Sequence, residues 1–276
     1  MKKNDKIIIY DDACPLCAAY TNGFVKSGMI EAGNRKNFSS IDPALLALID
    51  QRRSTDEIPL IDASTKQVWY GIDALLEILG QRCKWIKTTG QLAPVKWLLV
   101  KLYRAISYNR RVIVATEKPA GNFDCTPQFN VKYRLGFMFI FLLFNSLMLL
   151  PLHEYILQHS FFAAGFYRLQ WAHFAIVGIN IIIATRLPKQ AGIEYLGQVN
   201  MLALTVVLLL IPLMLLNSVF LNLYDLNNFY LGALALFTVM EYIRRMKYAK
   251  LFTRYRHVVW INVLALTLFL VYLNTK

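Results

Sequence analysis

Two cysteines separated by two residues, Cys14 and Cys17, form the only closely spaced thiol pair in the sequence. A short run of β-branched residues, Ile7–Ile9, precedes them, and a segment with a helical pattern follows. A buried strand that leads into Cys-x-x-Cys at the start of a helix is typical of proteins that exchange thiols and disulfides. The spacing therefore predicts a redox domain in the N-terminal part of the chain.

The two cysteines are expected to differ in chemistry. Cys14 falls at the N-cap of the helix, with Pro15 at the first helical position, which favours proline. The backbone N–H of Cys17 then points back at the Cys14 sulfur, close to the positive end of the helix dipole. Both effects lower the pKa of a thiol. We therefore expect Cys14 to be the nucleophile and Cys17 to resolve the mixed disulfide.

The elements that must position this pair alternate between strands and helices. The pattern predicts strands at residues 6–10, 37–41, 58–62 and 67–70, and helices at residues 15–27, 43–51 and 71–79. We expect a turn near Ser64-Thr65 and a helix stop at Gly80. The resulting order of strand, helix, strand, helix, strand, strand and helix is that of a thioredoxin-like domain.

Three motifs carry a resemblance to a known family. The run Tyr10-Asp11-x-x-Cys14-x-x-Cys17 resembles the signature of the DCC family of thiol-disulfide oxidoreductases. Residues 69–79 (WYGIDALLEIL) and residues 103–111 (YRAISYNRR) are similar to the two later motifs of that family. The resemblance covers about residues 6–112 and implies a thioredoxin-like fold. It departs from the family at Asp12, where members often carry glycine.

The resemblance also implies a role for Pro59 and favours one for Asp11. Thioredoxin-like proteins place a cis-proline before the third strand, facing the cysteines, and Pro59 occupies that position, where it would shape the substrate groove. Asp11 is either a buried base that assists deprotonation of Cys17 or a turn residue that bonds its own backbone.

The cysteines leave other interpretations open. Cys14 and Cys17 could be half of a zinc site, although zinc usually needs a second close pair of ligands. Cys125 is either a third thiol that exchanges with Cys14 or an inert loop residue, and Cys83 has no assigned partner. No metal site and no cofactor are therefore expected.

The second half of the chain has a different composition. The chain is 57% hydrophobic with a mean hydropathy of +0.41. Residues 1–134 hold 20 of the 30 Lys and Arg and 13 of the 17 Asp and Glu, and charge-free runs dominate afterwards. We therefore expect a redox domain at residues 1–112, a linker at 113–134 and an all-α transmembrane domain at 135–276, with the lipid bilayer as a partner.

Five spans are expected in that domain. They lie at residues 135–153, 169–185, 195–224, 226–243 and 257–275, the fourth being the weakest. Basic residues fall before the first span, after the second and before the fifth, whereas the other loops carry few. The positive-inside rule then predicts a cytoplasmic N-terminal domain and a C-terminus outside. Residues 7–10 are too short for the apolar core of a signal peptide.

The net charge of +13 fits basic residues beside membrane spans, and no nucleic-acid-binding motif accompanies it. Among the polar residues of the spans, three histidines and a glutamate near the first outside loop are either metal ligands or interfacial residues. The residues in question are His153, Glu154, His159 and His173. Four asparagines could line an interhelical site, as could Glu241 unless it pairs with nearby arginines. These asparagines are Asn145, Asn180, Asn200 and Asn217.

Together these features predict a membrane-tethered thiol-disulfide oxidoreductase that acts on a protein thiol or disulfide. A cytoplasmic location would keep the pair reduced, so that it acts as a reductant or a redox sensor. No cysteine follows Cys125, which excludes a thiol relay through the bilayer. The alternatives are a non-catalytic module that binds a partner protein or zinc, and a quinone-linked membrane reductase.

Overall fold

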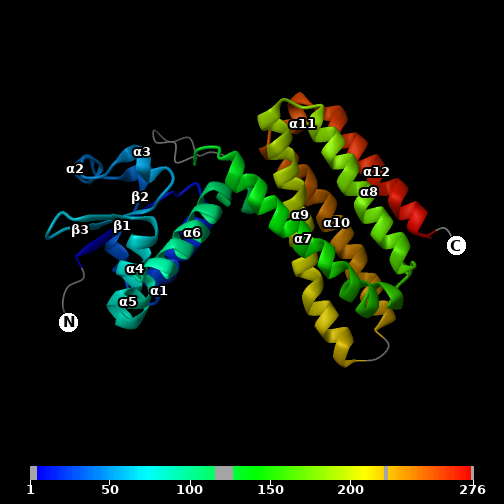
Figure 1. Cartoon of the computed structure of the whole chain (residues 1–276), viewed down its shortest axis with the longest axis horizontal. Coiled ribbons are helices and arrows are strands. Elements are labelled where there is room, and N and C mark those ends of the chain that lie inside the picture. Colours follow the sequence, from blue (N-terminus) through cyan, green and yellow to red (C-terminus); the bar gives the residue numbers. More distant parts are fainter. Residues whose placement is uncertain (1–4, 116–126, 221–222, 275–276) are drawn as a thin grey trace. The chain divides into compact units, whose positions relative to one another are not determined.

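The computed structural model describes residues 5–115, 127–220 and 223–274. The chain divides into two compact units, Met1–Tyr133 and Arg134–Lys276, which are described separately. The first unit is an α/β domain with a four-stranded sheet, and the second is helical (Figure 1). The predicted fold class is therefore confirmed, whereas the predicted linker at 113–134 stays a prediction.

The sheet of the first unit has the strand order β2-β1-β3-β4. Its strands are β1 (Lys6–Tyr10), β2 (Arg35–Asn37), β3 (Pro59–Asp62) and β4 (Val68–Tyr70). β1 runs parallel to β2 and antiparallel to β3, and β3 and β4 form a hairpin. The sheet is therefore mixed, and its strands and the main helices follow one another along the chain in the thioredoxin-like order that the sequence predicts.

Helices cover both faces of the sheet, because neighbouring β1 residues point to opposite sides. Ile8 packs in a core with residues of α1 (Pro15–Lys26) and α4 (Gly71–Arg82), whereas Ile9 packs in a second core on the other face. The second core includes the short elements η2 (Phe38–Ser40) and α2 (Pro43–Leu46). Ile8 and Ile9 are both fully buried.

Several predicted boundaries differ from the structure. The second strand ends at Asn37 and a 3₁₀ turn follows, and the helix expected at 43–51 is two short helices, α2 and α3 (Gln51–Ser54). Gly80 lies inside α4 instead of ending it. Glycine is needed at this position for a different reason: a Cβ there would come within 2.7 Å of the Lys87 side chain in α5 (Lys84–Gly90). The glycine therefore permits close helix packing.

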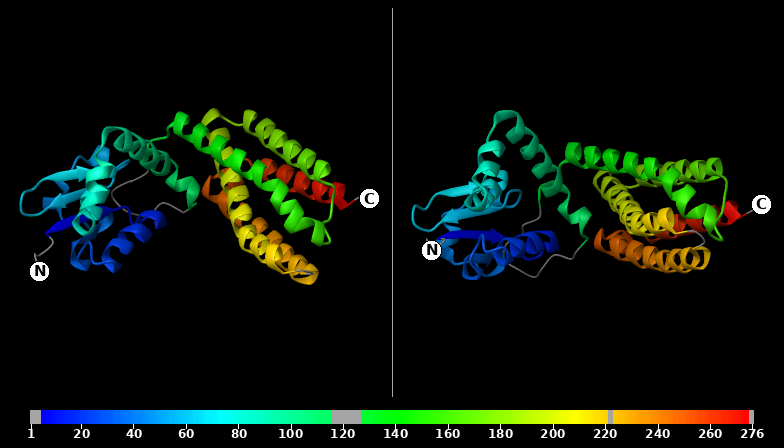
Figure 2. Two further views of the ribbon diagram at one scale, coloured as in Figure 1. Left: turned by 60° about the horizontal axis from the view of Figure 1, so that its bottom comes forward. Right: turned by 90° about the horizontal axis from the view of Figure 1, so that it is seen from below.

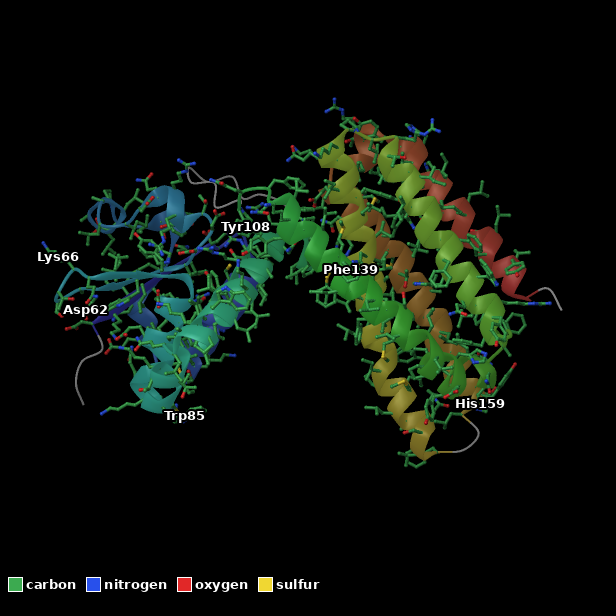
Figure 3. The ribbon with its side chains drawn as sticks, viewed as in Figure 1. Asp62, Lys66, Trp85, Tyr108, Phe139 and His159 are labelled. Carbon is green, nitrogen blue, oxygen red and sulfur yellow. The ribbon has the colours of Figure 1, made fainter. Side chains whose placement is uncertain are left out.

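The β3–β4 turn lies where the sequence predicts it. Asp62 Oδ1 accepts the backbone N–H groups of Ser64 and Thr65, each at 3.0 Å, and Lys66 adopts a left-handed conformation with φ 58°. Figure 3 labels Asp62 and Lys66 at this hairpin tip. Two further helices complete the unit after α4, namely the short α5 and the long α6 (Ala93–Ile113). The 3₁₀ turn η1 (Ala32–Asn34) precedes β2.

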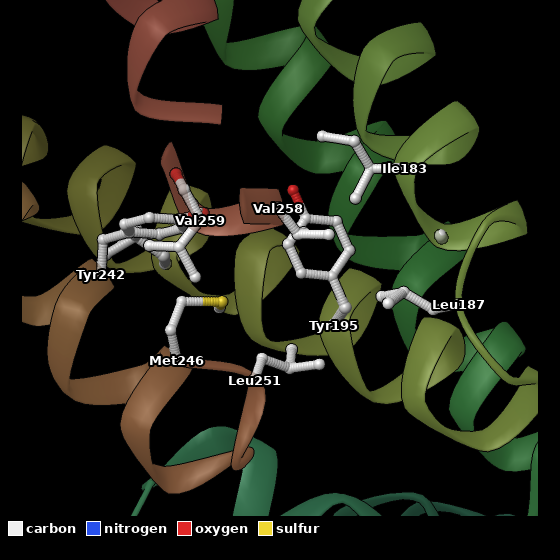
Figure 4. Close-up of a cluster of buried hydrophobic side chains, with 10 residues drawn as sticks. Ile183, Leu187, Tyr195, Tyr242, Met246, Leu251, Val258 and Val259 are labelled. Carbon is white, nitrogen blue, oxygen red and sulfur yellow. Dashed lines mark hydrogen bonds between the residues drawn. The ribbon is translucent and has the colours of Figure 1, made fainter. Parts of the chain in front are cut away.

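The second unit is a bundle of long helices that lie beside one another (Figures 1 and 2). Its elements are α7 (Val131–Tyr155), η3 (Leu157–His159), α8 (Phe166–Thr185), α9 (Lys189–Val219), α10 (Tyr224–Tyr248), α11 (Leu251–Arg254) and α12 (Arg256–Asn274). Its main buried cluster joins Tyr195 of α9, Met246 of α10 and Val259 of α12 (Figure 4). Bulky apolar side chains from separate helices therefore hold one end of the bundle together.

Three helical segments of the described residues are long and apolar enough to cross a membrane. They are Val131–His159, Phe166–Thr185 and Lys189–Val219, and Arg256–Phe269 is a shorter apolar helix. α10 has the predicted position but carries Glu241, Arg244 and Arg245 in its last turns. The membrane-type helical region is thus confirmed, and the count of five spans stays a prediction.

Candidate functional site

Cys14 and Cys17 lie at the start of α1, as predicted. Cys14 is the N-cap, with extended backbone angles (φ −104°, ψ 104°), and Pro15 follows at the first turn. The Cys14 sulfur accepts the backbone N–H of Cys17 at 3.3 Å. Both residues are free thiols and both are buried, whereas Asp12 and Pro15 on either side of Cys14 are exposed. The helix start therefore provides the capping hydrogen bond that favours a thiolate at Cys14.

Asp11 makes two kinds of contact at once. Its Oδ1 accepts the backbone N–H of Ala13 at 3.0 Å, and its carbonyl accepts the N–H of Cys14 at 3.1 Å. Its Oδ2 lies 3.2 Å from Nη2 of Arg110 in an ion pair that is more than nine-tenths buried on both sides. The turn geometry expected for Asp11 is therefore present, and the carboxylate also belongs to a buried charge pair.

Arg110 is the site residue for which sequence reasoning assigned no role. Its Nη1 lies 3.9 Å from Cys17 Sγ, while Nη2 also donates to the carbonyl of Thr55 at 3.1 Å. A single guanidinium thus contacts a cysteine, a carboxylate and a loop. The only signal in the sequence is the Asn109-Arg110-Arg111 motif, which carries the family resemblance but does not show that Arg110 meets residues more than 90 positions earlier.

One face of α6 holds this arginine in place. Tyr103, Ser107 and Arg110 recur at helical spacing, and each contacts the loop of residues 55–58 that leads into β3. Tyr103 Oη accepts the N–H of Ile58 at 2.9 Å, and Ser107 donates to the carbonyl of Asp56. The helix therefore fixes the position of Arg110 and the loop before β3 together.

Gly71 allows Tyr103 to come close. It has a positive φ of 56°, and a Cβ there would lie 3.2 Å from a ring carbon of Tyr103. Its N–H donates to the carbonyl of Ile58 at 2.9 Å. A residue with a side chain would be strained in this conformation, so the start of α4 requires glycine.

The electrostatics of the pair separate the two thiols. The hydrogen bond from the Cys17 thiol, helped by the backbone N–H of Cys17 and by Arg110, lowers the pKa of Cys14 from 9.0 to about 7 despite burial. The same thiol hydrogen bond, together with burial, raises the pKa of Cys17. Burial raises the pKa of Asp11, although Arg110, Arg111 and the Ala13 N–H oppose this. Cys14 is thus the thiol that ionises near neutral pH.

The prediction of a cis peptide bond before Pro59 is wrong. No described residue forms a cis peptide bond, so the Ile58–Pro59 bond is trans. Pro59 is buried at the start of β3, where it pairs with Tyr70, and the Ile58 backbone on its N-terminal side bonds with both Tyr103 and Gly71. These two bonds hold the extended entry into the strand. The role of Pro59 in a substrate groove stays a prediction.

The remaining cysteines do not join the pair within the described structure. Cys83 is a half-buried free thiol between α4 and α5, and Cys125, the predicted third thiol, lies outside the described residues. In residues 5–115, 127–220 and 223–274, no group of three or more His, Cys, Asp or Glu side chains could hold a metal ion.

The polar residues singled out in the helical unit bond to separate partners. His153 lies 2.8 Å from the carbonyl of Ala164, and His173 lies 2.9 Å from the hydroxyl of Ser146. All four predicted asparagines bond across helices, through the pairs Asn145–Asn200, Asn180–Tyr195 and Asn217–Asn227. Glu241 pairs with Arg244 at 2.7 Å and with Arg245 at 2.8 Å. The asparagine contacts therefore join separate helices, whereas the Glu241 ion pairs lie within α10.

The comparisons agree with the geometry of the first unit. Residues 8–115 match the model of the family described as DCC1-like thiol-disulfide oxidoreductase. No curated protein and no solved structure matches the chain. The match covers most of the sheet, the cysteine pair and Arg110, and confirms the resemblance that the motifs indicated.

Proposed function

We propose, from the match of residues 8–115 to DCC1-like thiol-disulfide oxidoreductases, that this chain is a membrane-tethered enzyme that reduces disulfides on the cytoplasmic side. The observation that carries the proposal is the N-cap position of Cys14, whose sulfur accepts the N–H of Cys17 while Arg110 contacts the Cys17 sulfur. A low-pKa thiol with a partner one turn away is the arrangement that thiol–disulfide exchange requires.

In the first step, the Cys14 thiolate attacks one sulfur of a substrate disulfide. A Cys14–substrate disulfide forms, the substrate S–S bond breaks, and the second substrate sulfur leaves as a thiolate. The pKa of about 7 keeps a large fraction of Cys14 ionised near neutral pH, so attack needs no separate base.

In the second step, Cys17 loses its proton and attacks the Cys14 sulfur. The Cys14–Cys17 disulfide forms and the bound substrate sulfur leaves, so that two electrons have moved from the cysteine pair to the substrate. Once Cys14 is in a mixed disulfide, it no longer accepts the Cys17 thiol hydrogen bond, which is the main cause of the raised pKa of Cys17. Arg110 then stabilises the Cys17 thiolate, and Asp11, paired with the same guanidinium, assists the proton transfer.

The distribution of charge supports the cytoplasmic placement of the domain. One end of the helical unit joins the starts of α7 and α9 to the end of α10, through the contacts Arg134–Glu194 and Arg245–Gln198. Basic residues gather at this end, namely Lys132, Arg134, Arg186, Lys189, Arg244, Arg245, Lys247, Lys250, Arg254 and Arg256. Among the described residues, the opposite end carries Arg168 with Glu154 and Asp225. The positive-inside rule places the basic end in the cytoplasm.

Trapping of a mixed disulfide tests the redox proposal. In the full-length protein, Cys17→Ser leaves Cys14 able to attack but removes the resolving thiol, so disulfide-linked adducts accumulate that reducing agent releases. Cys83→Ser is the matched control and behaves as wild type. Absence of adducts with Cys17→Ser, or equal adducts with Cys14→Ser/Cys17→Ser, contradicts the assignment of Cys14.

A labelling experiment tests the orientation. We expect an impermeant maleimide to label Cys83 of a Cys14→Ser/Cys17→Ser/Cys125→Ser variant in inside-out vesicles from expressing cells. The same reagent should leave right-side-out vesicles unlabelled until detergent is added. The reverse pattern would place the domain outside and overturn the cytoplasmic assignment, but it would leave the redox assignment intact.

A further inference from the structure

The outward side of α5 and α6 exposes an unusual number of large apolar side chains. Six residues on these two helices and the segment between them each expose 50–70% of their surface. They are Trp85, Leu92, Trp97, Leu98, Leu102 and Ile106, and they are called here the outer face. Figure 3 labels Trp85 on α5. Two exposed tryptophans within a group of leucines mark an interaction surface, because soluble surfaces seldom leave such a patch in water.

The outer face is a regular feature of α6. Leu98, Leu102 and Ile106 recur every four residues and therefore lie along one side of the helix. The inward side of the same helix carries Tyr103 and Ser107, which bond to the loop before β3. The helix is thus attached to its own domain through polar contacts and turns an apolar stripe outward. This distribution indicates that the stripe serves contacts outside the domain.

The charge around the outer face is of one sign. Residues 78–116 contain no Asp or Glu, whereas residues 81–106 contain six basic residues. Acidic residues elsewhere in the domain pair with three of these: Lys87 with Glu77, Lys96 with Asp73 and Arg104 with Glu57. Lys84 and Lys101 form no ion pair with any residue that the structure describes, and Lys101 lies 5.9 Å from the ring centre of Trp97. Basic charge is therefore available beside the tryptophans.

We propose that the outer face of α5 and α6 binds the surface of an anionic lipid bilayer. Tryptophan favours the boundary between headgroups and acyl chains, leucine and isoleucine favour the chains just below it, and lysine binds lipid phosphates. The combination of a helix with one apolar side, flanking lysines and no acidic residue is typical of a segment that lies in this boundary. Basic residues near the cytoplasmic leaflet gain further from its anionic lipids.

The helical second unit keeps the lipid bilayer close to the first unit. Residues 114–130 separate α6 from α7, the start of the first segment able to cross a membrane. A chain of that length extends at most about 60 Å, so the bilayer is always within reach of the domain. Tethering raises the effective concentration of a surface, and a modest intrinsic affinity then suffices. The binding surface lies about a quarter turn around α6 from the contacts of Tyr103, so lipid contact and the redox site use different sides of one helix.

Fluorescence quenching in nanodiscs tests the inference. The probe protein is the full chain with Trp69, Trp171 and Trp260 replaced by Phe, so that Trp85 and Trp97 remain. It is inserted at one chain per disc into phosphatidylcholine with about 30% phosphatidylglycerol, with or without dibrominated phosphatidylcholine. We expect bromolipid to lower the fluorescence by roughly half or more, because the outer-face tryptophans lie within the lipid boundary. A matched protein that keeps only Trp69, which lies in β4, is not quenched.

Charge variants isolate the electrostatic part. Lys84→Glu/Lys101→Glu removes most of the quenching, whereas Lys36→Glu/Lys66→Glu, the same change of charge at exposed positions on other elements, leaves it unchanged. High salt, or discs without phosphatidylglycerol, also weakens the quenching. Equal quenching in neutral discs overturns the anionic preference.

Two results overturn the proposal as a whole. If bromolipid has no effect and aqueous iodide quenches Trp85 and Trp97, the outer face is open to water. If both quenchers fail, protein covers the face, and the single chain per disc identifies the cover as the chain's own helical unit. Neither result affects the trapping experiment at Cys14, so failure here is distinguishable from failure of the redox assignment.

Discussion

Replacement of Arg110 by methionine is the sharpest test of how the site works. Arg110 Nη1 lies 3.9 Å from the Cys17 sulfur in a buried environment. At that distance, a unit positive charge stabilises a thiolate by about 4 kcal/mol if the effective dielectric constant is about 20. The Asp11 carboxylate on the same guanidinium offsets part of this. We therefore expect Arg110→Met to slow the attack of Cys17 on the mixed disulfide by about 10- to 100-fold.

Glutathione disulfide provides the assay. Reduced full-length protein in detergent is mixed with it, quenched with acid at intervals, and analysed by mass spectrometry for glutathione attached to Cys14. In the wild type the adduct is short-lived, because Cys17 displaces glutathione. In Arg110→Met the adduct accumulates, while its rate of formation changes less, because Arg110 contributes less than the hydrogen bonds from Cys17 to lowering the pKa of Cys14.

Two controls separate charge from folding. Arg104→Met removes an exposed arginine from the same helix and should resolve the adduct as wild type does. Arg110→Met alone removes the ion-pair partner of the buried Asp11. If Asp11 stays charged, the free energy of unfolding falls by about 3–5 kcal/mol. The double variant Asp11→Asn/Arg110→Met has no buried charge at these two positions and avoids this loss. A double variant that has wild-type thermal stability and resolves the adduct more slowly than Asp11→Asn alone supports the role of Arg110. Wild-type resolution in both Arg110 variants would refute the reasoning.

Three further predictions concern the thiols and Asp11. Cys17→Ala removes the thiol donor that does most to lower the pKa of Cys14. We expect the pKa of Cys14 to rise from about 7 by roughly one unit, which makes its thiolate fraction at pH 7 about fivefold smaller. Cys17→Ser keeps a hydroxyl donor and should shift less, as the pH dependence of iodoacetamide alkylation will show. Asp11→Asn removes a negative charge that raises the pKa of Cys14, so that pKa falls while resolution of the glutathione adduct slows. An unchanged resolution rate would leave Asp11 with its turn role alone. Because the folded pKa of Cys14 lies below 9.0, unfolding takes up a proton between pH 7 and 9, and the reduced protein gains up to about 3 kcal/mol of stability as the pH rises through that window. Denaturant unfolding of the reduced protein should show this gain and Cys14→Ser should lack it; equal pH profiles would contradict the lowered pKa.

The N-terminal domain shows which features local sequence can predict. Strands β1, β3 and β4 and the helix starts at Pro15 and Gly71 lie where the pattern places them, because apolar periodicity and N-cap chemistry act over a few residues. The helix end expected at Gly80 was wrong. Glycine is required there because the side chain of Lys87, seven residues later in another helix, packs against it, and a local pattern does not reveal this contact. The helix expected at 43–51 divides in two, and Asp50 caps the second piece by accepting the N–H of Arg53 at 3.0 Å.

The candidate site likewise has one part that local sequence predicts and one part that it does not. The relation between Cys14 and Cys17 spans three residues, so the helix start by itself determines which sulfur receives the N–H. The relation between Arg110 and Asp11 spans 99 residues, and no local pattern distinguishes Arg110 from its neighbour Arg111. Only the packing of α6 against the loop of residues 55–58 determines which of the two arginines reaches the cysteines.

The amino-acid sequence alone indicated the main features of this protein: a thiol at a helix N-cap, a second thiol one turn later, and apolar helices long enough to cross a membrane. These properties depend on residue type and short spacing, over which the geometry of a helix is always the same. The tertiary structure decided which cation faces Cys17, how Asp11 is paired and which side of α6 turns outward. Those relations join segments far apart in the chain, and such contacts form only when the sheet and its helices pack together.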